Sequence, residues 1–360
     1  MRGGRKFQRP AVEDSPSLAA PEQAALTAVR PIRVVAIGGG TGLSTLLRGL
    51  RRHVVQAGES GAQGEIADLA AVVTVTDDGG SSGRLRKGFN MLPPGDLRNC
   101  MVALSEEEDL LAQLFNHRFR GGDSLQGHNF GNLFVAALTE ITGDFALAIE
   151  LSSKILATRG RIYPATTANT MLVARMDDGS LVRGETNITA SRRRIVELTL
   201  DPPGPEPLPE TLEAIARADL ITVGPGSLYT SLVTNLLVQG IPAALARARG
   251  LRVFICNLMT QANESLGLAA SEHIERIYDH TRAPVFDCAL INTAPFSAET
   301  LARYAAESAS PIVADIERVH ALGVRVIAGN FASEGNVVRH AADRVTAALL
   351  ELGQSAAPRS

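Results

Sequence analysis

The stretch IRVVAIGGGTGLS, residues 32–44, is the part of the sequence that decides the expected fold. It begins with a short β-branched run between Pro31 and Gly38, which is typical of a buried parallel strand. Four glycines then fall within the five positions 38–42, directly before a helical pattern. Such a turn leaves unpaired backbone N–H groups pointing at one spot, where the positive end of the helix dipole also lies. This segment therefore predicts a turn that suits phosphate.

Two further segments have the same character. They are AVVTVTDDGGSSGRLR at 71–86 and DLITVGPGSLYTS at 219–231. Because the carboxyl ends of parallel strands meet at one edge of a sheet, three such turns indicate a nucleotide or nucleotide-sugar held at that edge.

Strand and helix patterns alternate with short connections through most of the chain, which predicts right-handed crossovers and one α/β, doubly wound, Rossmann-like, mostly parallel sheet. The expected strands are 32–37, 71–75, 220–223, 252–256, 286–291 and 324–327. The expected helices are 43–52, 95–119, 129–156 with a break near Gly143, 211–217, 228–238, 269–279, 298–307 and 335–352.

The stretch 161–200 departs from this alternation. It is rich in threonine and β-branched residues and contains the hairpin signal Asp177-Asp178-Gly179, which predicts a small antiparallel excursion. Residues 31–353 are expected to form a single nucleotide-binding domain. The segments 1–30 and 354–360 are expected to be disordered tails.

Composition narrows the class of protein. The net charge is −3, aromatic residues make up 4% of the chain and tryptophan is absent, so neither nucleic acid nor a membrane is an expected partner. No apolar run is long enough for a membrane span. Cys100, Cys256 and Cys288 stand apart, which predicts buried thiols in a reducing, cytoplasmic compartment.

The first glycine turn supplies the candidate ligand-binding residues Gly39, Gly40, Thr41 and Gly42. It lacks the lysine of a P-loop, which disfavours a Walker-type ATPase. Leu43 stands where a dinucleotide fingerprint has its third glycine, so an NAD-dependent enzyme ranks last among the functions considered. The plain alternative is a tight turn without a ligand, although four glycines are more than a turn requires.

The second glycine turn follows two adjacent carboxylates at a strand end, Asp77 and Asp78. Such a pair can bind a ribose, hold a hydrated Mg²⁺ or act as a base. Ser81 is a further ligand candidate, and Arg84 or Arg86 can clamp a phosphate. The plain alternative is an Asp-Gly turn with solvated charges.

Polar residues in three other strings complete the candidate set. Asn99 lies in PPGDLRN, and His128 and Asn129 open a helix in GHNFGN, where they would contact a ligand or a catalytic water. Asn129 is alternatively a helix cap. The third glycine turn contributes Gly224, Gly226, Ser227, Thr230 and Ser231, with a simple capped helix as the alternative. Polar residues also follow a strand in the string CNLMTQ at 256–261.

In their order along residues 32–270, the strings GGGTGLS, TDDGGSSGRLR, PPGDLRN, GHNFGNL, GPGSLYTS and CNLMTQ resemble the gluconeogenesis-factor family (YvcK type). That family is related to the 2-phospho-L-lactate transferases (CofD) of deazaflavin cofactor synthesis. The resemblance implies a Rossmann-like fold, a cytoplasmic location and a role in bacterial cell shape and envelope maintenance on gluconeogenic carbon sources. It also implies binding of UDP-sugars such as UDP-N-acetylglucosamine, with no settled reaction.

Where the strings match, the resemblance implies a site formed by residues of the three glycine turns together with Asn99, His128 and Asn129. The string GPGSLYTS favours the gluconeogenesis-factor branch. One departure follows Gln261: the family usually continues with Pro-Gly-Glu-Thr, whereas this chain has Ala262-Asn263-Glu264-Ser265.

Two functions from different classes follow. The first is a regulatory protein that binds a UDP-sugar or another nucleotide, with the diphosphate on the first and third turns, the ribose on Asp77 or Asp78, and Asn99 and Asn129 orienting the base or sugar. The second is an enzyme of the phospho-lactate transferase type, in which Asp77 and Asp78 hold Mg²⁺ and a deazaflavin alcohol attacks. No catalytic residue is assigned; Asp77, Asp78 and His128 are the candidates. Protein partners and a homo-oligomeric state are left open.

Overall fold

The structure is a computed structural model that describes residues 30–55, 65–106, 110–122, 124–191, 193–262 and 264–356. Its centre is a seven-stranded parallel sheet with the strand order β10-β9-β8-β7-β1-β2-β3. The strands are β1 (Ile32–Gly38), β2 (Ile66–Val73), β3 (Arg161–Pro164), β7 (Leu220–Val223), β8 (Leu251–Ile255), β9 (Cys288–Asn292) and β10 (Arg325–Gly329). The predicted doubly wound α/β fold is thereby confirmed.

The chain reverses its direction of travel across the sheet at β1. The chain builds outward from β1 to β2 and β3 on one side, and then returns to continue through β7, β8, β9 and β10 on the other. Strand β1 is therefore hydrogen-bonded to both β2 and β7, with Val34 opposite Leu220 and Gly38 opposite Val73. In sheets of this kind the crevice for a ligand opens at the carboxyl ends of the strands at this reversal.

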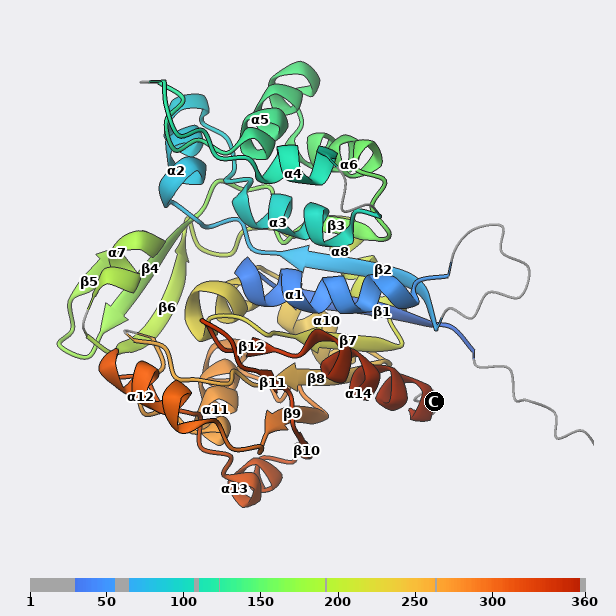
Figure 1. Cartoon of the computed structure of the whole chain (residues 1–360), viewed down its shortest axis with the longest axis vertical. Coiled ribbons are helices and arrows are strands. Elements are labelled where there is room, and N and C mark those ends of the chain that lie inside the picture. Colours follow the sequence, from blue (N-terminus) through green and yellow to red (C-terminus); the bar gives the residue numbers. More distant parts are fainter. Residues whose placement is uncertain are drawn as a thin grey trace, which may run out of the picture.

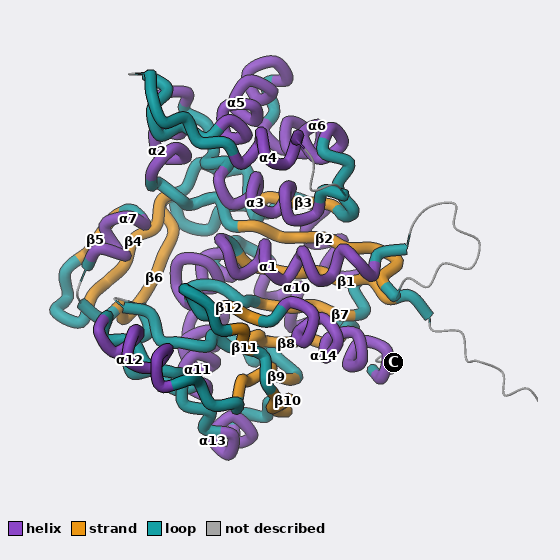
Figure 2. The backbone as a smooth tube through the Cα atoms, in the orientation of Figure 1, coloured by secondary structure: helices purple, strands orange, loops and turns teal. Residues whose placement is uncertain are grey.

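Helices cover both faces of the sheet, as Figures 1 and 2 show. Alternate residues of β1 supply the two cores, because successive side chains of a strand point to opposite faces. Val34 and Ala36 pack against one layer, and Val35 and Ile37 against the other. The first layer contains α1 (Gly40–Leu50), α3 (Gly95–Leu104), α4 (Leu110–Asn116), α5 (Phe130–Thr142), α6 (Phe145–Ile155) and α14 (Ala342–Ser355). The second contains α8 (Pro209–Arg217), η2 (Leu228–Val233), α9 (Thr234–Leu236), α10 (Ile241–Arg247) and α11 (Ala270–Thr281).

Two small antiparallel sheets lie outside the main one. One contains β4 (Met171–Met176), β5 (Leu181–Arg183) and β6 (Ile195–Asp201), and the other pairs β11 (Ala332–Ser333) with β12 (Arg339–His340). The remaining helices are η1 (Arg51–His53), α2 (Gly80–Phe89), α7 (Glu185–Ala190), α12 (Ala298–Ala306) and α13 (Ile316–Ala321). Strand β12 contacts α1, so a segment near the C-terminus lies beside the first glycine turn (Figure 1).

The structure corrects several expected boundaries. The antiparallel excursion was expected from residue 161, but Arg161–Pro164 pairs in parallel with β2 and closes the main sheet. The helix expected at 95–119 is divided into α3 and α4. The helix expected at 335–352 begins only at Ala342, because residues 339–340 pair with β11 instead. The break near Gly143 is confirmed: this glycine adopts φ 68° at the end of α5, where a left-handed residue commonly ends a helix.

The division into one domain with two tails stays a prediction. Residues 1–29 and 357–360 lie outside the described part of the chain, whereas Gln354 and Ser355, expected in the second tail, belong to α14. Within the described ranges, no single helix has the length and apolar character to cross a membrane. One pair bent by 77°, Leu228–Leu236 with Ile241–Arg247, passes that test jointly by length and composition only.

Candidate functional site

The reversal at β1 brings the first and third glycine turns into backbone contact. The Gly224 N–H group donates to the Ile37 carbonyl oxygen (2.9 Å). A β-carbon at position 42 would overlap the Pro225 carbonyl, so only glycine permits this approach. Gly224 has φ 98°, a backbone conformation that other residues rarely adopt. The sequence places these glycines where two turns must touch.

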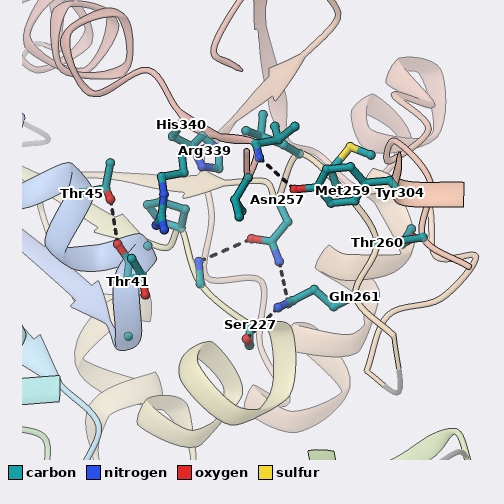
Figure 3. Close-up of a pocket in the computed structure, with 18 of the residues that line it drawn as sticks. Thr41, Thr45, Ser227, Asn257, Met259, Thr260, Gln261, Tyr304, Arg339 and His340 are labelled. Carbon is teal, nitrogen blue, oxygen red and sulfur yellow. Dashed lines mark hydrogen bonds between the residues drawn. The ribbon is translucent and has the colours of Figure 1, made fainter. Parts of the chain in front are cut away.

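A cleft of about 530 Å³ opens beside this contact at the carboxyl ends of the strands (Figure 3). Of the predicted ligand-binding residues, those that line it are Gly39, Gly40, Thr41, Gly42, Gly226, Ser227 and Ser231. Helix α1 begins at Gly40, so its first N–H groups and the positive end of its dipole lie at the cleft. The first and third turns thus lie at one cleft, whereas no residue of 77–83 lines it; the role of these turns in ligand binding stays a prediction.

Amide side chains form the side of the cleft that follows β8. The Gly226 N–H group donates to Asn257 Oδ1 at 3.4 Å, and Asn257 Nδ2 donates to Gln261 Oε1 at 3.3 Å. Gln261 Nε2 in turn donates to Ser227 Oγ at 3.0 Å, as the dashed lines in Figure 3 show. The first two bonds are long, and a ligand with its own donors and acceptors can replace them.

The opposite side of the cleft is built by residues that the sequence analysis missed. They are Arg303, Tyr304 and Glu307 of the α12 segment and residues 336–340 of the chain leading into β12. The Val338 N–H group donates to Tyr304 Oη (2.8 Å), which joins the two segments. Residues 335–341 were expected to be helical, and a helix there would not have reached the cleft.

This wall carries two cations, Arg303, which donates to the Gly335 carbonyl oxygen (2.7 Å), and Arg339. Arg339 extends from β12 toward the side of the cleft where Thr41 and Thr45 lie (Figure 3). Burial, and then the positive charge of Arg339, lower the pKa of Arg48, whose Nη2 donates to Thr45 Oγ1 at 3.1 Å. Neither guanidinium pairs with a carboxylate of the described residues. Arg48 lies in the last turn of α1, whereas Arg339 lines the cleft, where a guanidinium favours an anionic ligand.

His340 follows Arg339 and is a neutral residue at physiological pH. Its Nε2 lies 3.1 Å from the Cys256 carbonyl oxygen, and burial lowers its pKa to about 4. The ring therefore acts as a hydrogen-bond donor that ties β12 to the end of β8, and not as a cation for a ligand.

The carboxylates of the second turn lie next to the cleft but do not line it. Asp77 Oδ1 accepts from the Gly79 N–H group (2.8 Å). Asp78 Oδ1 accepts from the backbone N–H and the hydroxyl of Thr186 (2.8 and 2.6 Å), which ties the second turn to α7. One oxygen of each side chain is thus already used by the protein.

Asp96 of α3 lies against the first turn, and the sequence alone gave no reason to select it. Its carboxylate accepts a hydrogen bond from the Gly40 backbone, and a β-carbon at Gly39 would lie 2.8 Å from Asp96 Oδ2. Burial raises the pKa of Asp96 to about 6, and the nearby charge of Asp77 adds to this. Glu185 of α7 is affected more strongly: burial and then the charges of Asp77, Asp96, Glu264 and Asp78 raise its pKa to about 9.

The residues around His128 form a separate group beside α2. His128 Nδ1 lies 3.2 Å from Ser81 Oγ, which also accepts from the Asn129 N–H group at 3.2 Å. Burial, followed by the charges of Arg84 and Arg118, lowers the pKa of His128. Asn129 is buried and caps α5 through the Asn132 N–H group (3.1 Å), as the alternative interpretation held.

Several predicted residues are engaged within the protein. Asn99 Oδ1 accepts from Arg98 Nη2 (2.7 Å), and Arg86 donates to Asn169 Oδ1. Thr230 is buried and donates to Glu264 Oε1 (2.8 Å), while Glu264 Oε2 accepts from the Tyr229 N–H group (3.1 Å). Glu264 thus caps the first turn of η2, and the altered loop 262–265 retains a structural contact to the third glycine turn.

A resident metal would need several ligand side chains grouped together. Among the described residues, no three His, Cys, Asp or Glu side chains are grouped so that they could hold a metal ion. Mg²⁺ often binds through one or two carboxylates together with water and substrate phosphates. Asp77 and Asp78 therefore fit such an ion only as two of its ligands, with a nucleotide supplying others.

Comparisons with known proteins agree with this architecture. A model of the family described as 2-phospho-L-lactate transferase CofD matches residues 34–332. A gluconeogenesis factor of Halalkalibacterium halodurans is 47% identical over 319 residues, which cover 88% of this chain and 95% of that protein. The gluconeogenesis factor of Bacillus subtilis is 44% identical over 321 residues, covering 89% and 98%.

The similarity extends to a solved structure. An X-ray crystal structure of a protein from Bacillus halodurans superposes with a TM-score of 0.84 at 46% identity, covering 89% of this chain and 100% of that one. With sequence and fold in agreement over nine-tenths of the chain, the protein belongs to the 2-phospho-L-lactate transferase (CofD) family and groups with the gluconeogenesis factors.

Proposed function

We propose that this protein binds a UDP-sugar in the cleft between the first and third glycine turns and acts as a regulatory protein, not as an enzyme with a turnover reaction. The observation that carries the proposal is the backbone contact of Gly42 with Pro225, which gathers N–H groups of two turns at one cleft. A diphosphate is the ligand group that such a cradle recognises.

The phosphates would lie against Gly40, Thr41 and Gly226, where the N-terminus of α1 opens into the cleft. Arg339 would supply the positive charge that a P-loop lysine provides elsewhere, because the first and third glycine turns contain no cation of their own. The cleft volume of about 530 Å³ falls within the usual range for small-ligand sites.

The base or sugar would lie against the amides of Asn257 and Gln261. A primary amide both donates and accepts hydrogen bonds, which matches the alternating donors and acceptors of a uracil ring. This assignment replaces the role expected for Asn99 and Asn129, whose oxygens are occupied by Arg98 and by the α5 cap. Asp77 and Asp78 stay as candidates for hydroxyl groups that extend beyond the cleft.

The physiological part of the proposal is a cytoplasmic role in maintaining cell shape and envelope during gluconeogenic growth. Support comes from the relatives named gluconeogenesis factor at 44–47% identity. Deletion of the gene should impair growth on gluconeogenic carbon sources and leave growth on glucose intact. An Arg339→Ala allele should fail to complement if UDP-sugar binding is the relevant activity.

Isothermal titration calorimetry with UDP-N-acetylglucosamine, UDP-glucose and UDP is the direct test. We expect saturable heat and a rise in the thermal midpoint with each UDP compound, because a ligand that binds only the folded state stabilises it. Absence of both effects would remove the proposal.

The second candidate is a transferase that uses Mg²⁺ and a deazaflavin alcohol acceptor. It is favoured by the description of the matching family and by the carboxylates Asp77 and Asp78 beside the cleft. In that case Mg²⁺ would neutralise the charge on the nucleoside monophosphate that leaves when the phospholactyl group passes to the acceptor alcohol. Incubation with Mg²⁺, a guanylyl donor of 2-phospholactate and the acceptor should yield the phospholactyl product; UDP-sugar binding without Mg²⁺ and without product would argue against it.

A further inference from the structure

A buried asparagine outside the ligand-contacting residues joins the two glycine turns. Asn235 belongs to α9 and is fully buried. Its Nδ2 donates to the Gly38 carbonyl oxygen at 2.9 Å and to the Ser231 carbonyl oxygen at 2.6 Å. Gly38 ends β1 at the first turn, and Ser231 lies in η2 and lines the cleft. One amide group therefore holds both sides of the cleft.

The orientation of this amide follows from its surroundings. Both acceptors are carbonyl oxygens, which cannot donate, so the NH₂ group must face them. Among the described residues Asn235 Oδ1 has no hydrogen-bond partner although it is buried, an arrangement that costs free energy. A polar group kept in the core at such a cost points to a geometric requirement that an apolar side chain of the same size does not meet.

Asn235 positions the Gly38 carbonyl group, which begins the first glycine turn. The oxygen of this group also accepts from the Thr74 N–H group (3.1 Å), so β2 and α9 fix it from two directions. On the other side, η2 is a π-helical turn in which the N–H groups of Ser231 and Leu232 both donate to the Ser227 carbonyl. Turns of this kind are less stable than an α-helix and need support from their neighbours.

We propose that Asn235 is a positioning residue that sets the distance between the first and third glycine turns, and that the ligand affinity of the cleft depends on its NH₂ group. We call the two hydrogen bonds from Asn235 Nδ2 to the Gly38 and Ser231 carbonyl oxygens the clamp. The identity of the ligand rests on the proposed function, but the clamp does not depend on which ligand binds. Asn235 does not itself line the cleft, so its effect on binding must act through the two turns that it holds.

The test compares Asn235→Leu, which keeps the size and removes both donors, with Leu349→Ala in the buried face of α14. Both variants lower the thermal midpoint. Only Asn235→Leu should weaken UDP-N-acetylglucosamine binding, by roughly tenfold or more, since a displaced turn loses charge-assisted hydrogen bonds. Equal affinity of Asn235→Leu and wild type would overturn the clamp.

Asn235→Asp supplies a readout that a purely structural role would not change. A protonated carboxyl group donates one hydrogen bond and an ionised one donates none. The affinity of this variant relative to wild type should therefore recover as the pH falls from 8 to 5.5, and wild-type affinity at pH 8 would contradict the proposal. This comparison also serves if Asn235→Leu does not fold.

Hydrogen exchange separates failure of the clamp from failure of the proposed function. In the ligand-free protein, the Thr74, Ser231 and Leu232 amides should exchange faster in Asn235→Leu than in Leu349→Ala. If wild type binds no UDP compound but these amides are deprotected, the proposed function falls and the clamp stands. If the amides exchange at the same rate in both variants, the clamp is refuted whatever the ligand.

Discussion

Replacing Gly42 by alanine tests the contact on which the cleft depends. The added β-carbon would overlap the Pro225 carbonyl oxygen and approach the Pro225 carbonyl carbon to 2.8 Å and Gly226 N to 3.1 Å. All three atoms belong to the backbone, so no side-chain rotation relieves the overlap. The turns would have to separate by roughly 1 Å to restore ordinary van der Waals distances.

A separation of that size moves the backbone N–H groups out of register with the phosphates. Loss of one charge-assisted hydrogen bond costs about 1.5–3 kcal/mol, which is about a 10- to 150-fold weaker dissociation constant. Overpacking should also lower the free energy of unfolding by about 1–3 kcal/mol. Calorimetry with UDP-N-acetylglucosamine and urea denaturation measure the two effects separately.

Gly88→Ala is the matched control. Gly88 lies in α2, and a β-carbon there would meet nothing within 4 Å. Alanine in a helix interior should stabilise the fold by about 0.5–1 kcal/mol and leave binding unchanged. Wild-type affinity and stability in Gly42→Ala would refute the reasoning that the two turns touch and that their contact shapes the ligand site.

Three further predictions address single charged groups. The pKa of Asp96 is about 6 in the folded state, above its value in the unfolded chain. Between pH 4 and 6 the folded state therefore binds more protons than the unfolded state does. The contribution of Asp96 to the free energy of unfolding falls as the pH rises through that range. An anion bound at the first turn should favour the protonated form of Asp96. The affinity for a UDP-sugar should therefore fall by up to roughly tenfold per pH unit from pH 6 to 8. If Asp96 is responsible, calorimetry on Asp96→Asn should show an affinity that does not change with pH over this range. Arg339→Ala should weaken UDP-sugar binding by about 1.5–3 kcal/mol and reduce the salt dependence of binding. The control Arg318→Ala removes a surface ion pair with Glu275 and should change neither. Equal effects of the two substitutions would show that Arg339 is not the cation that binds the phosphates. Glu264→Met should lose about 1–3 kcal/mol in urea unfolding, because the Tyr229 N–H group would lose its acceptor in the core. Unchanged stability would show that the cap is dispensable.

The expected boundaries failed where pairing partners are distant in sequence. Nothing local distinguishes Arg161–Pro164 from the antiparallel strands that follow it, since its assignment depends on pairing with β2, roughly 90 residues earlier. The same holds for Arg339–His340, whose partner strand β11 is only two residues long and gives no periodic signal. That error also removed Arg339 from the expected site.

Residue chemistry was easier to predict than residue placement. The glycine turns were identified because glycine at a strand end before a helix has a local physical meaning, and seven of their residues line the cleft. Asn99, Asn129 and Thr230 have equally suitable side chains, but each is engaged within the protein. The partners of Asn99 and Asn129 are the adjacent Arg98 and the nearby Asn132, whereas folding brings Glu264 to Thr230. Asp96 was not predicted because its role depends on a hydrogen bond from the Gly40 backbone, which lies far from it in the sequence.

By itself, the sequence determined the alternation of strands and helices and the three turns with exposed N–H groups, because periodicity, β-branching and glycine act over a few residues. Only the tertiary structure decided which turns meet, that β12 brings a cation to them, and that a buried amide on α9 holds them together. These depend on strand order and on contacts between distant segments, such as Gly38 with Asn235, 197 positions apart, and α1 with β12, which lie further apart still. No local preference of the chain encodes such contacts.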